Sequence, residues 1–348
     1  LGGLWMEPVL YLGSYTKRGS KGVHQIILDT DKKELRDYRL IAEVDRPTYL
    51  DLSADKETLY AISKTDEGGG ITSFKKNENG SYDKVAEISA EGSAPCYIYF
   101  DEDKKLIFTA NYHGGYLTVY KENADGSFTM TDRAQHEGSS IHENQTIPHV
   151  HYSALSPDKK FLLACDLGTD EVYTYTVSDE GKLAEVARYK ATPGTGPRHL
   201  VFHPNGKVAY MFGELSSDVE VLAYDATTGT FSLLQVITTI PEEHTGFNGG
   251  AAIRISADGK FVYASNRGHD SLVVYAVSED GETLSLVEYV PTEGNIPRDF
   301  NLDPSGQFVI VAHQDSDNLT LFERDAETGK LTLLQKDVYA PECVCVFY

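Results

Sequence analysis

The sequence is poor in cysteine, methionine and tryptophan, with 4 Cys, 3 Met and 1 Trp among 348 residues. So few cysteines in a chain of this length cannot form the dense disulfide framework of a small secreted scaffold. They also lack the paired spacing of a structural zinc site. We therefore expect buried, reduced thiols and a cytoplasmic protein. The cysteines are Cys96, Cys165, Cys343 and Cys345.

Long apolar runs and basic residues are also scarce. No segment has the roughly 18 consecutive apolar residues that a membrane-spanning helix needs. Lys and Arg number 31 against 53 Asp and Glu, which gives a formal net charge of −22. A surface this acidic repels nucleic acids and anionic membranes, so we expect neither as a partner. An anionic small molecule would need a local pocket in which Arg and His gather.

The sequence does contain an internal repeat, which begins at a proline or an asparagine about every 49 residues. Each copy has an alternating apolar strand, a turn such as SPDK, HPNG or SADG, a second apolar strand, a third strand and a looser fourth. The apolar period of two excludes a helical solenoid, and four strands per repeat are typical of propeller blades. The copies begin at Pro47, Pro95, Pro148, Pro197, Asn248, Pro297 and Pro341.

The two ends of the sequence account for a seventh blade. Residues 11–35 form outer strands that no inner strand precedes, and residues 341–348 form an inner strand that no outer strand follows. Pairing of the two removes the last open edges of the ring. We therefore predict one all-β domain over residues 1–348, a seven-bladed β-propeller of four-stranded blades closed by the N- and C-terminal strands. We expect a monomer or a weak homo-oligomer.

Two positions of the repeat converge on one mouth of the central channel. The start of the first strand and the end of the second lie at the same end of an antiparallel hairpin. Because perturbed titratable groups cluster at functional sites, we interpret the residues at these two positions, which are named at the end of this paragraph, as an anion site rather than ordinary channel lining. The alternative is simple pairing, such as Arg198 with Glu214 or Arg267 with Asp299. Strand starts carry His149, His151, Arg198, His199, Asn248, Arg298 and Asp299, and strand ends carry Asn111, Tyr112, His113, Asp166, Glu214, Asn266, Arg267, His313 and Gln314.

A metal site is the less favoured interpretation of these residues. His149 and His151 are two positions apart on one strand and so face the same way, which suits a metal ion, but no third ligand follows at close spacing. We therefore expect no metal and no cofactor. A calcium site is disfavoured because the interleaved Arg198 and Arg267 would repel a divalent cation. Its ligands would be Asn111, Asp166, Glu214 and Asn266.

Four stretches of the sequence carry a family resemblance. They are HYSALSPDKKFL from His151, GTGPRHLVFHPNGKVAYMFGELSSDVEVL from Gly194, ISADGKFVYASNRGHDSLVVYAVSEDG from Ile255 and PRDFNLDPSGQFVIVAHQ from Pro297. These resemble the seven-bladed propeller lactonases, which include bacterial propeller-type 6-phosphogluconolactonases and fungal carboxy-cis,cis-muconate lactonising enzymes. The likeness covers nearly the whole chain. The segment GPRHLVFHPNG, followed by GEL, is absent from WD-repeat propellers.

The resemblance implies hydrolysis of 6-phospho-D-glucono-1,5-lactone to 6-phosphogluconate in the pentose phosphate pathway. Carried over by motif, the catalytic residues are His151, Arg198, Glu214 and Arg267, and the neighbouring His149, His199, Asn266, Arg298 and His313 are expected to bind substrate. Glu214 or His151 would activate water, and Arg198 or Arg267 would stabilise the oxyanion. His151 or His199 would protonate the leaving oxygen. Relatives often have Gly directly after the arginine that corresponds to Arg298. This sequence has Asp299 there, and its carboxylate is expected to weaken phosphate binding at Arg298.

Two other functions remain open. The same four residues could catalyse lactonisation of a carboxy-muconate, with the arginines holding its carboxylates. A non-catalytic binding scaffold is the other alternative, because propellers commonly present one face to partner proteins and a fold does not fix a function. A scaffold would expose an apolar patch on one rim, whereas most of the 22 Tyr and 14 Phe fall at alternating strand positions. We therefore expect a small anionic substrate as the partner.

Overall fold

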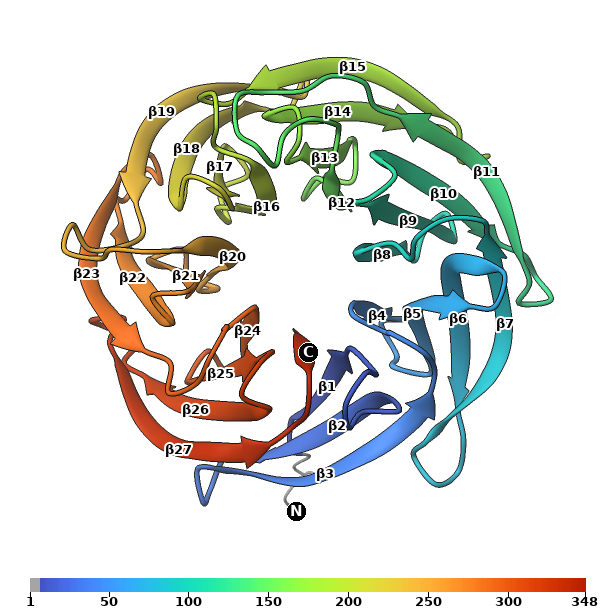
Figure 1. Ribbon diagram of the computed structural model, residues 1–348, viewed down its shortest axis with the longest axis horizontal. Coiled ribbons are helices and arrows are strands. Elements are labelled where there is room, and N and C mark those ends of the chain that lie inside the picture. Colours follow the sequence, from blue (N-terminus) through green and yellow to red (C-terminus); the bar gives the residue numbers. More distant parts are fainter. Residues whose placement is uncertain (1–6) are drawn as a thin grey trace.

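The computed structural model describes residues 7–348, and the regular secondary structure in that range is entirely β-strand. The strands form seven four-stranded antiparallel sheets, the blades, around a central channel (Figure 1). In blades 1 to 6 the strands follow chain order from the channel outward, and in blade 7 the order is β28, β1, β2, β3. The predicted seven-bladed propeller and its closure by the two terminal segments are thus confirmed. The first six residues of the predicted domain lie outside the described range.

The strand bounds of the first three blades are as follows. Blade 1 contains β4 (Leu50–Leu52), β5 (Thr58–Thr65), β6 (Gly68–Lys76) and β7 (Tyr82–Ala90). Blade 2 contains β8 (Tyr97–Asp101), β9 (Leu106–Asn111), β10 (Tyr116–Glu122) and β11 (Phe128–Gln135). Blade 3 contains β12 (Val150–Leu155), β13 (Leu162–Asp166), β14 (Glu171–Val177) and β15 (Leu183–Lys190).

The remaining four blades complete the ring. Blade 4 contains β16 (Pro197–Phe202), β17 (Val208–Gly213), β18 (Asp218–Asp225) and β19 (Thr230–Thr238). Blade 5 contains β20 (Gly249–Ile255), β21 (Phe261–Arg267), β22 (Ser271–Val277) and β23 (Leu284–Pro291). Blade 6 contains β24 (Asp299–Leu302), β25 (Phe308–His313), β26 (Asn318–Arg324) and β27 (Leu331–Tyr339), and blade 7 joins β28 (Cys343–Phe347) to β1 (Val9–Ser14), β2 (Gly22–Asp29) and β3 (Glu34–Glu43).

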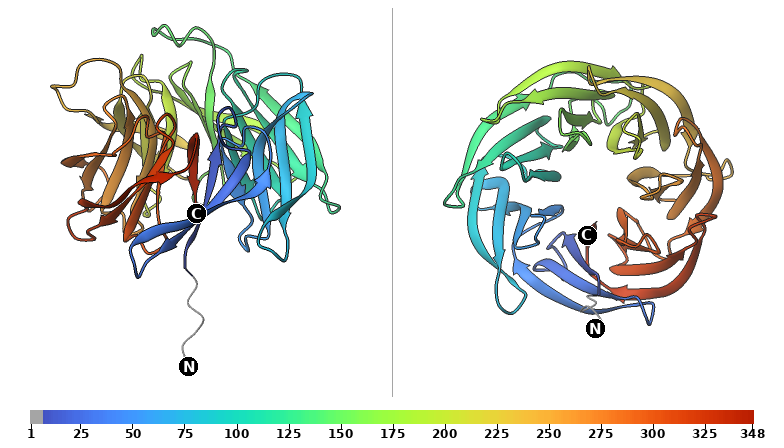
Figure 2. Two further views of the ribbon diagram at one scale, coloured as in Figure 1. Left: turned by 60° about the horizontal axis from the view of Figure 1, so that its bottom comes forward. Right: turned by 180° about the vertical axis from the view of Figure 1, so that it is seen from behind.

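The turn between the first two strands of a blade requires a residue whose backbone lies in the left-handed region, with positive φ. In blade 4 this residue is Gly206, with φ of 71°, and its N–H donates a 2.9 Å hydrogen bond to the carbonyl of His203. In blade 3 the same place is taken by Lys159, with φ of 61° and the equivalent bond to Ser156. A glycine adopts this conformation without steric cost, whereas a lysine does not. The turns cluster with the other loops at the two opposite faces of the ring (Figure 2).

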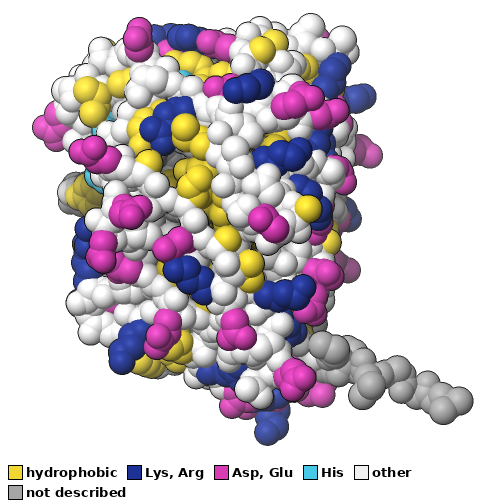
Figure 3. All heavy atoms as spheres, turned by 90° about the vertical axis from the view of Figure 1, so that its right-hand side faces the viewer, with side chains coloured by type: hydrophobic (Ala, Val, Ile, Leu, Met, Phe, Trp, Pro, Cys, Tyr) yellow, Lys and Arg dark blue, Asp and Glu magenta, His cyan; other side chains and the backbone are white. Residues whose placement is uncertain are grey.

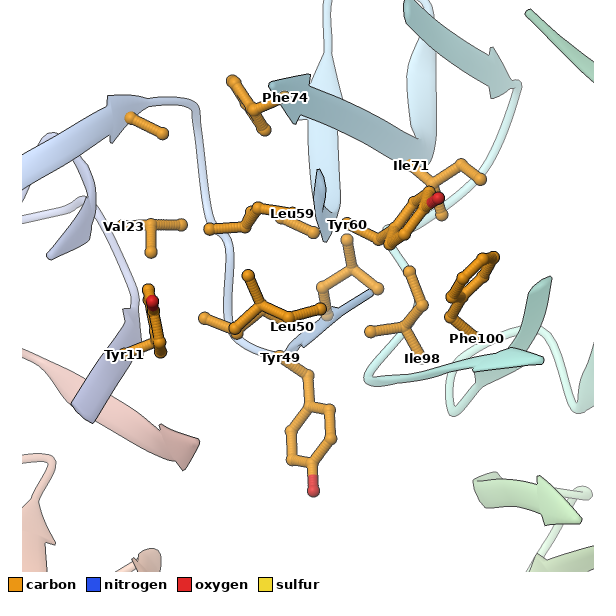
Figure 4. Packing of buried hydrophobic residues seen from close by; sticks show 14 of the residues in the cluster. Tyr11, Val23, Tyr49, Leu50, Leu59, Tyr60, Ile71, Phe74, Ile98 and Phe100 are labelled. Atoms are coloured by element: carbon orange, nitrogen blue, oxygen red, sulfur yellow. The ribbon is translucent and has the colours of Figure 1, made fainter. Parts of the chain in front are cut away.

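The hydrophobic core lies between neighbouring blades. One cluster joins Tyr11 and Val23 of blade 7 to Leu59 of blade 1 and to Ile98 and Phe100 of blade 2 (Figure 4). The inner strands bury both of their faces in this way, because a blade is covered on two sides, whereas outermost strands such as β7 and β15 carry several exposed residues. A large apolar side chain that is fully buried contributes about 1.5–3 kcal/mol to stability. The core therefore holds the strand ends, and the side chains they carry, in fixed positions around the channel.

Blade 7 is closed by pairing of β28 with β1. Leu12 lies opposite Val346, and Gly13 lies opposite Cys345. A Cβ atom at Gly13 would lie 2.5 Å from the carbonyl oxygen of Pro47 and 2.9 Å from Cβ of Cys345. The absence of a side chain at this position therefore lets the closing strands approach blade 1.

The carboxylate of Glu342 stabilises the same closure of blade 7. The side chain of Glu342, just before β28, accepts hydrogen bonds of 2.8, 2.9 and 3.0 Å from the backbone N–H groups of Lys17, Arg18 and Gly19. These residues follow β1, so the bonds join segments more than 300 positions apart in the sequence. An anion that accepts several backbone N–H groups forms strong, charge-assisted hydrogen bonds.

The outer wall of the ring is mixed in charge. Figure 3 views the side formed by blades 1 and 2 and shows basic and acidic side chains interspersed, with hydrophobic side chains between them. Among residues 7–348 no helix is long and apolar enough to cross a membrane.

Candidate active site

A cavity of about 480 Å³ lies where the strand starts and strand ends converge on the channel. All four predicted catalytic residues and Arg298 line it. Because these residues come from four different blades, their meeting at one cavity follows from the repeat rather than from sequence proximity. The cavity lining includes Tyr15, Arg46, Lys64, Ser93, Cys96, Tyr112, His113, His151, Arg198, Glu214, Arg267 and Arg298.

Two β-bulges direct catalytic candidates into this cavity. The register of the β12–β13 pair shifts at His151, and that of the β16–β17 pair shifts at Arg198. A bulge leaves the extra residue without a cross-strand partner and changes the direction of its side chain. The other candidates sit at strand ends, with Glu214 directly after β17 and Arg267 as the last residue of β21.

Glu214 stands between two arginines. Its Oε1 accepts a 2.8 Å hydrogen bond from Nη2 of Arg267 and lies 3.3 Å from Nε of Arg198, without the alignment of a hydrogen bond. Nε and Nη1 of Arg198 and Nε of Arg267 are buried and have no hydrogen-bond partner among the described residues. A buried donor of a charged group costs free energy when it is unpaired, so an acceptor bound in the cavity would be stabilised by these N–H groups.

The arginine cluster sets the charge states of the cavity. Burial favours the neutral form of Glu214, but Arg267 and Arg198 outweigh it and hold the pKa of the carboxyl below 4.5. Burial, with a further contribution from Arg267, lowers the pKa of Arg198 to about 9. At neutral pH the carboxylate and the guanidinium are therefore both charged, and the cations outnumber the anion.

His151 is a neutral imidazole within this cationic cluster. Burial is the largest cause, followed by Arg198 and His199, and together they lower the pKa of His151 well below 6.5. The side chain is 6% exposed, and its Nδ1 is buried with no hydrogen-bond partner in the described part of the chain. A neutral ring of this kind can accept a proton.

Arg298 is held by a partner that the sequence analysis did not select. Its Nη1 donates a 2.6 Å hydrogen bond to the hydroxyl of Tyr15 and a 3.2 Å bond to Oε1 of Gln314. The positive charge of Arg298 is the largest cause of a lowered pKa of Tyr15. Tyr15 follows β1, which is the second strand of blade 7, so it occupies the same place in its blade as Glu214 does in blade 4.

His199 lies beside the main cavity rather than on its wall. It lines a smaller adjoining cavity that it shares with His151, Arg198 and Arg298. Its ring is surrounded by aromatic rings, with centroids 5.4 Å from Tyr97 and 6.0 Å from Tyr152. Burial and then Arg198 lower the pKa of His199 well below 6.5, so this ring is also neutral at neutral pH.

Three further predicted substrate-binding residues do not line the cavity. His149 stacks on Tyr112 at 4.1 Å and directs Nδ1 to the Tyr112 carbonyl, so it supports the wall from behind. Asn266 is fully buried and bonds with Thr239. His313 is fully buried and its Nδ1 lies 3.0 Å from the carbonyl of Asn318. These three side chains are therefore not brought to the cavity, and their role in substrate binding stays a prediction.

Asp299 does not oppose Arg298 as expected. Its carboxylate accepts a hydrogen bond of 2.7 Å from the N–H of Val346 and one of 3.2 Å from Nη2 of Arg254. It thus pairs blade 6 with the closing strand and with a different arginine. The expected weakening of anion binding at Arg298 has no support in this arrangement, nor does pairing of Arg267 with Asp299.

The calcium ligands considered above do not come together either. Of the four, only Glu214 lines the cavity. Asn111 is bonded to the carbonyl of Ser93, and Asp166 to His136 and to the backbone of His149. Across residues 7–348 no group of three or more His, Cys, Asp or Glu side chains is placed to hold a metal ion.

Comparisons with known proteins agree with this architecture. The sequence model of the family described as "Lactonase, 7-bladed beta-propeller" matches residues 9–348. A 6-phosphogluconolactonase of Bacillus subtilis is 42% identical over 97% of both chains. The solved structure of a protein from Lactobacillus plantarum is 46% identical with a TM-score of 0.95, over 98% of this chain and 99% of that one. A periplasmic gluconolactonase of Pseudomonas aeruginosa is 32% identical with a TM-score of 0.91, over 97% and 98%.

Proposed function

The chain belongs to the seven-bladed β-propeller lactonase family, and we propose that it hydrolyses 6-phospho-D-glucono-1,5-lactone to 6-phosphogluconate. Family membership and the names of the relatives support hydrolysis of a sugar lactone. The phosphorylated substrate is our choice among sugar lactones, because the B. subtilis relative is named for it and the cavity carries an excess of cations. With this substrate we also propose a role in the pentose phosphate pathway and a cytoplasmic location.

One observation carries the proposal: buried, unpaired guanidinium donors lie beside a neutral imidazole. Hydrolysis of a lactone converts a neutral carbonyl carbon into a tetrahedral oxyanion and then into a carboxylate. Preorganised donors aimed at such developing charge are usually the largest source of catalysis. The unpartnered nitrogen atoms of Arg198 and Arg267 are donors of this kind.

The proposed reaction begins with attack of water on C1 of the lactone. His151 is the favoured general base, because its ring is neutral and can take the proton of the attacking water. Glu214 is the weaker candidate, since Arg267 and Arg198 hold its pKa low and Arg267 already bonds to its Oε1. Collapse of the tetrahedral intermediate breaks the bond to the ring oxygen, which takes back the proton from His151. The products are the open-chain hydroxyl and a carboxylic acid, which releases its proton to solvent and becomes the carboxylate.

Metal independence is part of the proposal for an electrostatic reason. The arginines around the cavity would repel a divalent cation, and they can supply the oxyanion stabilisation that a Lewis acid would otherwise provide. Turnover is therefore expected to survive removal of divalent cations by EDTA.

The test is hydrolysis of 6-phosphogluconolactone by the purified protein, measured against spontaneous hydrolysis and with or without EDTA. The expected result is rapid, EDTA-insensitive turnover that Arg198→Ala abolishes without a large change in thermal stability. No rate above background would refute the proposal. Assays with a carboxy-muconate, and a search for bound proteins, would then separate the cycloisomerase from the binding scaffold.

A further inference from the structure

The cavity has two cationic walls that differ in depth. One wall is buried and comes from blades 3 to 5, with Arg198 and Arg267 beside His151. The other comes from blade 1, where Arg46 precedes β4 and Lys64 lies near the end of β5. Figure 1 shows β4 and β5 across the channel from β16 and β20. Arg46 is half-buried and Lys64 is exposed, so this second wall is accessible to water.

Arg46 and Lys64 have no carboxylate to neutralise them. Among the described residues, neither side chain has a salt-bridge partner within 4.0 Å, although the net charge is −22. Their hydrogen bonds to the described residues are made through the backbone: the N–H of Arg46 donates to the hydroxyl of Thr16, and the N–H of Lys64 donates to the carbonyl of Asp45. Two unpaired cations on one wall attract an anion into the cavity.

The fold does not require an arginine at position 46. Its backbone has φ of 52°, and its carbonyl accepts a 2.8 Å hydrogen bond from the N–H of Thr48. In blade 6 the same turn is built around Ile296, with φ of 64° and a 2.8 Å bond from Arg298. Because an uncharged isoleucine occupies the equivalent turn, the charge of Arg46 is not explained by backbone geometry.

A hydroxyl completes this wall. Ser93 lies in the connection between β7 and β8, is exposed and lines the same cavity. Its carbonyl accepts a 2.9 Å hydrogen bond from Nδ2 of Asn111, which fixes the position of the connection. A guanidinium, an ammonium and a hydroxyl are the donors that commonly bind a phosphate monoester.

We propose that Arg46, Lys64 and Ser93 form a subsite for the phosphoryl group of the substrate. The lactone end then lies against the buried wall, where His151, Arg198 and Arg267 act on C1. Arg298 is a poorer candidate for the phosphoryl group because Tyr15 and Gln314 already engage its guanidinium. This inference rests on the proposed function and specifies which end of the substrate each wall binds.

The test compares two substrates, 6-phospho-D-glucono-1,5-lactone and unphosphorylated D-glucono-1,5-lactone. The variant Arg46→Gln with Lys64→Gln should lose about 10- to 100-fold in kcat/KM for the phosphorylated lactone, as expected for lost charged hydrogen bonds. Its kcat/KM for the unphosphorylated lactone should stay within about twofold. The control is Arg39→Gln with Lys75→Gln, which changes the net charge equally at two exposed residues outside the cavity.

Equal losses for both substrates, an equal loss in the control, or a wild type that does not prefer the phosphorylated lactone would each overturn the subsite. If the wild type hydrolyses neither lactone, the proposed reaction is refuted, and the subsite is tested by binding measurements instead. Calorimetry would then compare 6-phosphogluconate with gluconate. Tighter binding of the phosphorylated compound that the double variant loses would support the subsite, and equal binding of the two compounds would overturn it.

Discussion

Nη2 of Arg267 donates a 2.8 Å hydrogen bond to Oε1 of Glu214, and this bond links the second strands of two adjacent blades. Glu214 is the one carboxylate among the described residues that line the cavity, and it faces several arginines. The pair therefore both orients the cationic wall and limits its charge.

Glu214→Gln removes this charge while keeping the shape of the side chain. Loss of one partner of a buried ion pair costs about 3–5 kcal/mol, and less is expected here because the Glu214 side chain is 20% exposed. We expect a loss of about 2–3 kcal/mol in the free energy of unfolding, measured with urea, and a fall in kcat of about 100-fold. A loss of stability with unchanged kcat would restrict Glu214 to a structural role.

His151→Asn removes the proposed base. General-base catalysis contributes about 10²- to 10⁴-fold, so kcat should fall by that amount with little change in Tm. Because burial and Arg198 depress the pKa of His151, the rate of the wild type should not decline as pH falls through 6.5, but only well below it. The measurement is a pH–rate profile corrected for spontaneous hydrolysis. An acid limb centred near 6.5 would contradict the neutral-ring assignment.

The same depressed pKa values make stability depend on pH. Unfolded histidines bind a proton near pH 6.5, whereas folded His199 does not, because burial and Arg198 lower its pKa. The contribution of neutral His199 to the free energy of unfolding is complete above pH 6.5, and it is lost progressively as the pH falls from 6.5 toward the pKa of the folded state. His199→Phe keeps an aromatic ring among Tyr97 and Tyr152 and removes the titration. The variant should lose less Tm than the wild type between about pH 7.5 and about pH 5.5.

Glu342→Gln tests the fastening of blade 7. Burial would raise the pKa of Glu342, but the backbone N–H groups of Gly19 and Arg18 hold it below its usual 4.5. The carboxylate therefore contributes stability above 4.5 that is lost at lower pH. At neutral pH we expect the variant to unfold at a Tm several degrees lower, with kcat unchanged while it is folded. Glu279→Gln, an exposed position in a turn, is the control and should not alter Tm.

The fold was predictable because each blade repeats local signals, namely alternating strands and tight turns. Which of two adjacent strand-end residues faces the cavity was not predictable in this way. Arg267 faces the cavity while its neighbour Asn266 lies in a buried network, because adjacent strand residues point to opposite faces. The bulges at His151 and Arg198 have no signature in the repeat either. Tyr15 and Lys64 could have been found by applying the strand-end rule to blades 7 and 1. Arg46 precedes Pro47, where its copy of the repeat begins, and was missed for that reason.

Pairing of β28 with β1 has a consequence during synthesis. Blade 7 cannot form until residue 347 has left the ribosome, so β1 remains an open edge while the other six blades are made. Tyr15, which anchors Arg298, belongs to that last blade, so the cavity is assembled only at closure. A nascent or truncated ring should therefore be inactive and should expose a strand edge that chaperones or other chains can bind.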